Sequence, residues 1–345
     1  MTRIFMGMEK ALLVAENMSG TSGTWQVREF LGGSEVQAIT PDPLHPARVY
    51  AGAYRGLWRS DDGGATWYDL SSTFPQAAVM SIAVSAHERI GDTGIVYIGT
   101  EPSAVYRSED GGTTWHEGQP VTEMPSSGEW SYPPRPFTHH VRWLGLDPVE
   151  PGRLYACIEN GALIRSTDGG ATWHDRTADG PRDTHTFATH PKAPGRLYSA
   201  AGDGFMRPGR GYAESPDRGE TWVRISDGLA QPYLYGMAVD AANPDAVLIS
   251  ASPSPNHAHN PMAAEAHVYR KHGNGWREVT DGLPEAHGTM IHILAAHPTR
   301  SGVAYALCNR GLFQTEDGGD HWTPVPIPWP DHYRFWHMNA LAVTE

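Results

Sequence analysis

The chain has 345 residues, a length that fits one large domain or two to three small ones. Its formal net charge of −13 argues against a nucleic-acid partner, and it has no apolar stretch of the length that spans a membrane. Twelve Trp and 39% hydrophobic residues exclude a disordered chain, and two cysteines are too few for a disulfide framework.

The N-terminal segment predicts three strands, at residues 3–7, 11–15 and 24–30. Glu9 and Lys10 interrupt it where a signal peptide would carry an apolar run, so we expect a cytoplasmic protein.

From residue 36 onward, one order of short segments repeats. In its first copy an apolar stretch (36–40) is followed by a Pro-rich turn (41–48), two strands (49–54 and 56–60) and the box "SDDGGATW" (60–67), whose Trp begins a further strand. Similar boxes end at Trp115, Trp173, Trp222 and Trp322, and weaker ones at Trp25 and Trp276. The steps between these seven Trp are 42, 48, 58, 49, 54 and 46 residues.

Seven units of four short strands predict an all-β, seven-bladed β-propeller that forms a single domain over residues 1–345. The C-terminal segment "MNALAVTE" (338–345) supplies the first strand that the N-terminal unit lacks. We therefore predict that the two termini pair in one blade and close the ring.

The box itself is interpreted as a structural joint. Asp62, Asp110 and Asp168 are expected to accept hydrogen bonds from backbone amides two residues on, and the glycines that follow can adopt positive φ. Four copies match Ser-x-Asp-x-Gly-x-Thr-Trp, and in this the chain resembles the Asp-box (bacterial neuraminidase repeat) superfamily of sialidase-like and glycosyl hydrolase-like propellers. The resemblance implies the propeller fold. It leaves the function open among sialidases, xyloglucanases, sorting receptors and photosystem assembly factors.

Strand order predicts which face carries the site. The Pro-rich turns and the boxes must share one face, and the starts of the inner strands share the opposite face with the turns between second and third strands. Polar residues gather at the second face, and apolar residues follow them deeper in the inner strands. We predict a central pocket with a polar mouth there.

Four histidines stand at the starts of four inner strands: His140, His185, His292 and His337. Neutral imidazoles from several blades are suited to bind Zn, Fe, Mn or Cu, so we expect a divalent transition metal, with His185 and His292 as the first candidates. The alternative is that these side chains satisfy hydrogen bonds at strand ends or line a polar channel. His190 and His297, in the Pro-rich turns, are interpreted as turn residues.

Further candidates lie on the same face. The predicted catalytic residues are Glu101 and Glu159 as general acid or base, with Tyr233 and Arg142. The predicted substrate-binding residues are Arg55, Tyr235, Arg310, Trp130 and Trp336. Trp130 and Trp336 belong to insertions at about 119–138 and 326–337, and a third insertion covers 252–267. We expect the aromatic side chains of the insertions either to stack on a ligand or to seal the loops.

Two classes of function remain open. The first is a metal-dependent hydrolase or lyase that acts on a small anionic or carbohydrate-type substrate. It is not a typical sialidase, because the chain has no Phe/Tyr-Arg-Ile-Pro motif. The alternative is a non-catalytic binding or assembly propeller of the photosystem-assembly-factor type. The expected partner is a small molecule or a glycan, and the sequence does not determine the oligomeric state.

Overall fold

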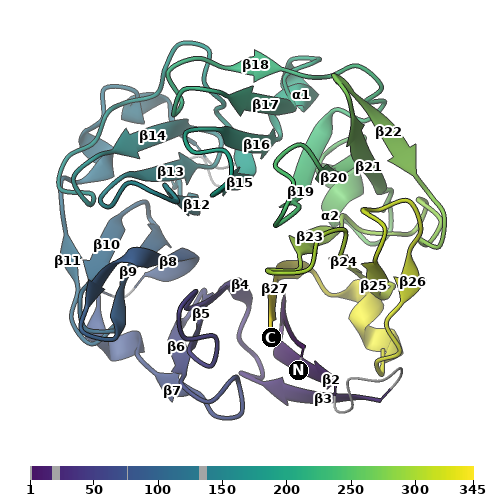
Figure 1. The fold of residues 1–345 in the computed structure, drawn as a ribbon, viewed down its shortest axis with the longest axis horizontal. Coiled ribbons are helices and arrows are strands. Elements are labelled where there is room, and N and C mark those ends of the chain that lie inside the picture. Colours follow the sequence, from purple (N-terminus) through teal and green to yellow (C-terminus); the bar gives the residue numbers. More distant parts are fainter. Residues whose placement is uncertain (1, 18–23, 76, 132–137) are drawn as a thin grey trace. The chain divides into compact units, whose positions relative to one another are not determined.

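The computed structural model describes residues 2–17, 24–75, 77–131 and 138–345, and its strands form seven sheets (Figure 1). Six sheets have four strands, in the orders β27-β1-β2-β3, β4-β5-β6-β7, β11-β10-β9-β8, β15-β16-β17-β18, β19-β20-β21-β22 and β23-β24-β25-β26. The seventh, β12-β13-β14, has three strands, and an isolated bridge between Arg165 and His174 marks the place of its fourth. The predicted all-β, seven-bladed propeller is confirmed.

The strands of the first four blades are β1 (Arg3–Met8), β2 (Leu12–Asn17), β3 (Trp25–Phe30), β4 (Val36–Pro41), β5 (Val49–Ala53), β6 (Gly56–Ser60), β7 (Tyr68–Asp69), β8 (Ala78–Ile90), β9 (Thr93–Glu101), β10 (Val105–Ser108), β11 (His116–Glu117), β12 (Val141–Leu146), β13 (Leu154–Ile158) and β14 (Ala162–Ser166). The last three blades contain β15 (Thr184–Thr189), β16 (Leu197–Ala201), β17 (Tyr212–Ser215), β18 (Val223–Arg224), β19 (Tyr233–Val239), β20 (Val247–Ser252), β21 (His267–His272), β22 (Gly275–Val279), β23 (Ile293–Ala296), β24 (Ala304–Cys308), β25 (Gly311–Thr315) and β26 (Thr323–Pro324). The C-terminal strand β27 (Met338–Thr344) belongs to the first blade. The described helices are short: η1 (Ser71–Thr73), η2 (Val121–Glu123), η3 (Ser127–Glu129), α1 (Asp203–Met206), α2 (Pro255–His259) and η4 (Asp331–Phe335), and no helix in the described ranges is long and apolar enough to cross a membrane.

The chain divides into two compact units. The first unit comprises Met1–Gly33, Ser199–Glu214 and Val223–Glu345, and the second unit comprises Ser34–Tyr198 and Ser215–Trp222.

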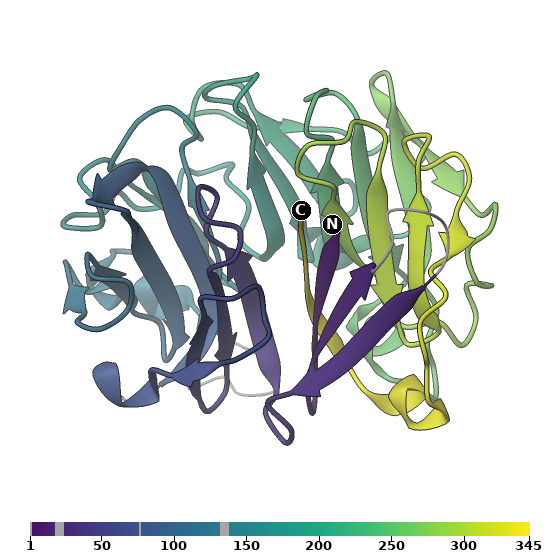
Figure 2. The same cartoon turned by 60° about the horizontal axis from the view of Figure 1, so that its bottom comes forward.

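The two ends of the chain meet in one sheet of the first unit. Strand β27 pairs antiparallel with β1, with Leu341 opposite Met6 and Thr344 opposite Arg3, so the ends lie side by side (Figures 1 and 2). The predicted pairing of the C-terminal strand with the N-terminal strand is confirmed.

Glycines on second strands let the inner strand of the next blade approach closely. A Cβ added at Gly99 of β9 would lie 2.5 Å from Val141 Cγ1 of β12, and one added at Gly52 of β5 would lie 2.5 Å from Val79 Cγ1 of β8. Blades are also joined by hydrogen bonds, such as the one that Ser81 Oγ donates to the carbonyl of Val141 at 2.7 Å. These contacts bring the starts of successive inner strands near one another.

The eight-residue boxes are turns built around their Asp. Asp62 Oδ1 accepts the backbone amides of Ala65 and Thr66, both at 2.9 Å, and the hydroxyl of Ser60 at 2.8 Å. Its Oδ2 accepts the Thr66 hydroxyl at 2.6 Å, while Gly64 has a φ of 88°. The expectation of amides two residues on is wrong, because the turn places the amides three and four residues on over the carboxylate.

Each box also joins neighbouring parts of the propeller. Within the second unit, Arg59 Nη1 of β6 donates to the carbonyl of Gly111 in the next blade's box at 2.8 Å. The Trp115 indole that ends this box meets Phe74 edge-on, with ring centroids 6.3 Å apart. The weak box that ends at Trp276 is instead a tight hairpin between β21 and β22, and the one that ends at Trp25 falls largely on residues outside the described ranges.

Hydrogen bonds within blades separate the two predicted faces. A residue of the box donates its amide to the Pro-rich turn of the same blade, as in Gly63 to Ala47 at 2.7 Å and Gly169 to Gly152 at 2.8 Å. At the other end, Tyr54 N donates to Glu35 O and Glu159 N donates to His140 O, both at 3.2 Å. Turns between second and third strands therefore lie beside the starts of first strands, as predicted.

Candidate functional site

A buried cluster of carboxylates and imidazoles lies in the second unit, where strands of three blades end or begin. Its members are Glu101 at the end of β9, His140 and Arg142 at the start of β12, Glu159 after β13, and Asp183 and His185 at the start of β15. All six stood on the face that strand order assigned to the site. The structure brings them together because inner strands of adjacent blades begin at the same end.

The local backbone fixes the two acidic members of this cluster. Glu159 donates its amide to His140 O at 3.2 Å, which holds the β13–β14 turn against the start of β12. The next residue, Asn160, has a φ of 49° and donates its amide to Asp183 Oδ1 at 2.9 Å. This hydrogen bond leaves the carboxylate of Asp183 oriented by the neighbouring blade.

His140 lies between two carboxylates. Its Nε2 is 2.8 Å from Glu159 Oε2, its Nδ1 is 3.5 Å from Glu101 Oε2, and its side chain is 1% exposed. Burial by itself would lower the pKa of His140, but the charges and hydrogen bonds of Glu159 and Glu101 outweigh it and raise the pKa. The imidazole is thus placed to hold a proton between two acids.

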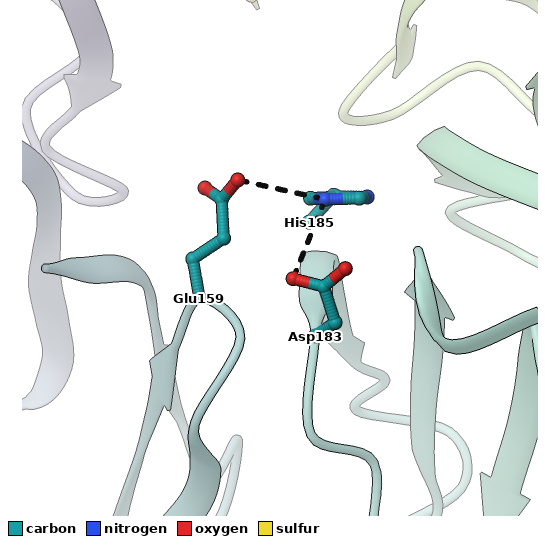
Figure 3. Close-up of side chains that lie close together, drawn as sticks. All are labelled: Glu159, Asp183 and His185. Atoms are coloured by element: carbon teal, nitrogen blue, oxygen red, sulfur yellow. Dashed lines mark ion pairs between the residues drawn. The ribbon is translucent and has the colours of Figure 1, made fainter. Parts of the chain in front are cut away.

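His185 faces the same carboxylate from the next blade. Its Nε2 lies 3.7 Å from Glu159 Oε1 and 3.7 Å from Asp183 Oδ1, and Figure 3 shows both carboxylates directed toward the imidazole. Donor atoms of the three residues all lie within 4.8 Å of one another. The two 3.7 Å separations are too long for charge-assisted hydrogen bonds of about 2.7–2.9 Å. They approach the spacing of about 3.3–3.6 Å between donors that surround one tetrahedral ion at 2.0–2.2 Å.

Positive charge surrounds Glu159. Arg142 Nε is 3.7 Å from Glu159 Oε2, and both side chains are largely buried. Burial would raise the pKa of the Glu159 carboxyl, but the neighbouring imidazoles and the Arg142 guanidinium hold it well below its usual range. Glu159 is therefore an anion, the state that a metal ligand requires.

A cavity of about 530 Å³ opens beside this cluster and shares one residue with it. Its lining comprises Tyr54, Arg55, Gly56, Ser71, Phe74, Ala77, Ala78 and Glu101. Glu101 thus connects the cavity to His140, and the predicted residue Arg55 lies in the cavity wall.

Apart from Trp130, the remaining predicted residues lie in the first unit. Tyr233 and Tyr235 of β19 have ring centroids 6.3 Å apart in a stacked arrangement, and the Tyr233 hydroxyl is 3.2 Å from His259 Nε2. His259 in turn lies 6.0 Å from His337, between ring centroids. These four rings form a local aromatic and imidazole group.

His292 lies in the first unit as a fully buried imidazole. Neither ring nitrogen has a hydrogen-bond partner among the described residues, and burial lowers its pKa to about 4. Arg310 donates Nε to Gly288 O at 3.0 Å, and Trp336 packs against Tyr333 with centroids 4.9 Å apart.

Trp130 has the second of the two roles that the sequence left open for it, which is to seal its loop. Its side chain is 5% exposed, belongs to the core around β12–β14, and donates Nε1 to Ser126 Oγ at 3.0 Å. It packs the insertion onto the blade and presents no open ring face for a ligand. Tyr132 and Arg135, which the sequence also places in this insertion, lie outside the described residues.

Sequence reasoning proposed histidines alone as metal ligands and omitted Asp183 from that set. The spacing Asp183-x-His185 carried the missing signal, because alternate residues of a strand point to the same side. Turn residues were recognised correctly: His297 Nδ1 accepts the amide of Arg300 at 3.1 Å, and His190 Nδ1 accepts that of Lys192 at 3.1 Å.

No protein-family model matches the chain. It is 28% identical over 255 residues to xyloglucanase Xgh74A of Acetivibrio thermocellus, a match that covers 63% of this chain and 29% of that protein. It is also 28% identical over 352 residues to a xyloglucanase of Paenibacillus sp., covering 86% of this chain and 33% of that protein. The chain thus spans about a third of the length of these relatives.

Solved structures share the fold. The GH74 enzyme of Niastella koreensis superposes with a TM-score of 0.61 at 19% identity, covering 84% of this chain and 46% of that chain. YCF48 bound to D1 peptide superposes with a TM-score of 0.58 at 16% identity, covering 84% and 81%. The protein is therefore a seven-bladed β-propeller related in sequence to part of the xyloglucanases.

Proposed function

We propose that the protein is a metal-dependent hydrolase of a carbohydrate-type substrate, with the ion held by Glu159, Asp183 and His185. The observation that carries the proposal is the spacing of 3.7 Å from His185 Nε2 to one oxygen of each acid. Two carboxylates and one imidazole, without thiolate, suit Zn or Mn among the candidate metals. Three protein ligands leave a position open for water or substrate.

The residues around the ion have complementary roles. Glu159, Asp183 and His185 would hold a divalent cation, which would supply a lowered pKa of bound water or the polarisation of a substrate oxygen. Glu101, in the cavity wall and 3.5 Å from His140 Nδ1, is the general acid or base that meets the substrate. His140 orients Glu159 and Glu101, and Arg142 balances the charge of Glu159. The sequence similarity to xyloglucanases supports the carbohydrate class of the substrate.

The metal content of the purified protein tests whether Glu159, Asp183 and His185 bind an ion. Protein purified without a histidine tag is incubated with Zn²⁺ or Mn²⁺, desalted and analysed by inductively coupled plasma mass spectrometry. We expect about one ion per chain in the wild type and its loss in His185→Ala and in Asp183→Asn. His116→Ala is the matched control, because His116 is exposed on β11 and has no side-chain partner among the described residues. An ion that survives both substitutions, or a wild type that binds none, contradicts the proposal.

An assay of oligosaccharide hydrolysis tests the proposed reaction and the role of Glu101. A panel of neutral and acidic oligosaccharides is incubated with wild type and with Glu101→Gln, and reducing ends are measured. We expect release by the wild type and a loss of 100-fold or more in Glu101→Gln, the size of effect typical for a general acid or base. Equal rates in both proteins would remove Glu101 from the chemistry.

A second candidate is a non-catalytic binding propeller. The comparison with YCF48 favours it, because that match covers 81% of a chain described as bound to a peptide, whereas the GH74 match covers 46%. Absence of both metal and hydrolysis, in protein that is folded, would make binding the better proposal.

A further inference from the structure

The cavity beside Glu101 has the features of a small-ligand site. It lies between the blade β4–β7 and the blade β8–β11 of the second unit, and its volume of about 530 Å³ is typical of pockets for small molecules. Its lining residues include two aromatic residues, Phe74 and Tyr54, and the hydroxyl-bearing Ser71. Such a mixture of ring faces and a few polar groups suits a hydroxylated ring.

Arg55 stands at the tip of the β5–β6 turn, and its backbone is tightly held. Tyr54 N donates to Glu35 O at 3.2 Å on one side of it. On the other side, Gly56 has a φ of 147°, and a Cβ there would come within 2.0 Å of Ser71 Oγ. Ser71 Oγ also accepts the amide of Leu57 at 3.2 Å. The turn therefore presents Arg55 from a fixed backbone position.

Arg55 differs from the other arginines described in the second unit. Its side chain is exposed and has no hydrogen-bond, ion-pair or ring partner among the described residues. Arg196 stacks on Tyr198. The others pair with carboxylates; they are Arg48, Arg59, Arg89, Arg107, Arg142, Arg153, Arg165, Arg176, Arg182 and Arg218. In a chain with a net charge of −13, an arginine without an acidic partner in a cavity wall is available to an anionic ligand.

We infer that Arg55 binds the carboxylate of an acidic sugar in this cavity, so that the substrate is a uronic-acid-containing glycan. The inference rests on the proposed function for the reaction, but the binding of the acid itself does not. A guanidinium offers two parallel N–H groups that match the two oxygens of a carboxylate. The lining rings contact the sugar, and Glu101 lies in the same wall at the side of the catalytic cluster.

One negative charge fits this cavity better than two. Glu101 is itself an acid in the lining, and Arg55 is the single arginine or lysine among the described lining residues. Arg55 and Glu101 already offset each other, so a uronate adds one negative charge to the cavity, whereas a phosphate dianion adds two and is opposed more strongly by Glu101. Neutral sugars have no carboxylate and therefore form no charge-assisted, bidentate pair with Arg55.

The test measures binding of glucuronate, glucose and glucose 6-phosphate by isothermal titration calorimetry. We expect the wild type to prefer glucuronate, and Arg55→Gln to weaken it by about 10- to 100-fold while leaving glucose unchanged. Arg207→Gln is the matched control, because Arg207 is also exposed and lacks a side-chain partner among the described residues, but it does not line the cavity. Glu101→Gln should bind glucuronate as tightly as the wild type or more tightly, since it removes a negative charge.

The outcomes separate this inference from the proposed hydrolysis. Equal affinity for glucose and glucuronate, or no effect of Arg55→Gln, overturns the acidic-sugar inference even if a neutral glycan is hydrolysed. A preference for glucose 6-phosphate likewise overturns it in favour of a phosphorylated ligand. Binding of glucuronate that depends on Arg55, in a protein with neither metal nor hydrolysis, supports the inference and contradicts the proposed enzyme.

Discussion

Replacing Asp62 by alanine should destabilise the protein through the box and not through the candidate site. The carboxylate accepts four hydrogen bonds, at 2.6 to 2.9 Å, from the two amides and two hydroxyls of its own turn. Alanine can accept none of them, so the turn loses the group around which it folds.

The size of the effect depends on exposure. A hydrogen bond to a charged group contributes about 1.5–3 kcal/mol when it is buried. The amides of Ala65 and Thr66 are exposed and regain bonds to water in the variant, while the bond from Ser60 is partly buried. We therefore expect a loss of about 1–3 kcal/mol in the free energy of unfolding, measured by urea denaturation at pH 7.

The same measurement at low pH adds a second test. Burial would raise the pKa of Asp62 slightly, but the hydrogen bonds from Thr66 and Ser60 lower it to about 2. A carboxyl with a depressed pKa stabilises the folded state above the unfolded pKa of about 3.9, and this contribution is lost as pH falls through the folded value. The difference between wild type and Asp62→Ala should therefore shrink from pH 4 to pH 2.

Asp92→Ala provides the matched control, because Asp92 is exposed in the β8–β9 turn and its side chain has no partner among the described residues. It should change stability by less than about 0.5 kcal/mol. Equal midpoints for the two variants, or a difference that is as large at pH 2 as at pH 7, would refute the role assigned to the box. Binding of ligand by folded Asp62→Ala should match the wild type.

Two further predictions concern packing. Gly99→Ala should lower the free energy of unfolding by about 1–3 kcal/mol, because the new methyl group would lie 2.4 Å from Ser81 Oγ and 2.6 Å from Val141 Cβ. Urea denaturation measures this loss, with Gly128→Ala as the control, because a Cβ at Gly128 meets nothing within 4 Å. Equal stability of the two variants would contradict the close contact between the blades. Cys157 and Cys308 should react with a thiol reagent only after unfolding, because both are buried and burial raises the pKa of the Cys308 thiol to about 12. Rapid labelling of the native protein would contradict this prediction and show that the blades containing these cysteines open in the folded state.

The candidate site could be predicted only in part. Strand order placed Glu101, His140, Glu159 and His185 on one face, and the structure brings them together in the second unit. The sequence did not predict which side-chain atoms are in contact, because contacts between blades depend on how closely strands approach at positions such as Gly99. The spacing Asp183-x-His185 indicates that both side chains share one side of the strand, but the 3.7 Å between them is known only from the structure. The exposed side chain of Arg55 in a cavity wall is likewise known only from the structure.

The sequence by itself determined the propeller, the seven blades, the pairing of the terminal strands and the division into two faces. The repeats contain this information locally, because the residues of each unit determine its own turns and strands. The number of units then determines that the two terminal segments share one blade and close the ring. Only the tertiary structure decided the partners of each functional side chain. His140 received two carboxylates, Trp130 became part of the core, and His292 remained a buried imidazole without a partner among the described residues. These outcomes depend on distances between residues of different blades, and the spacing of residues along a chain does not encode such distances.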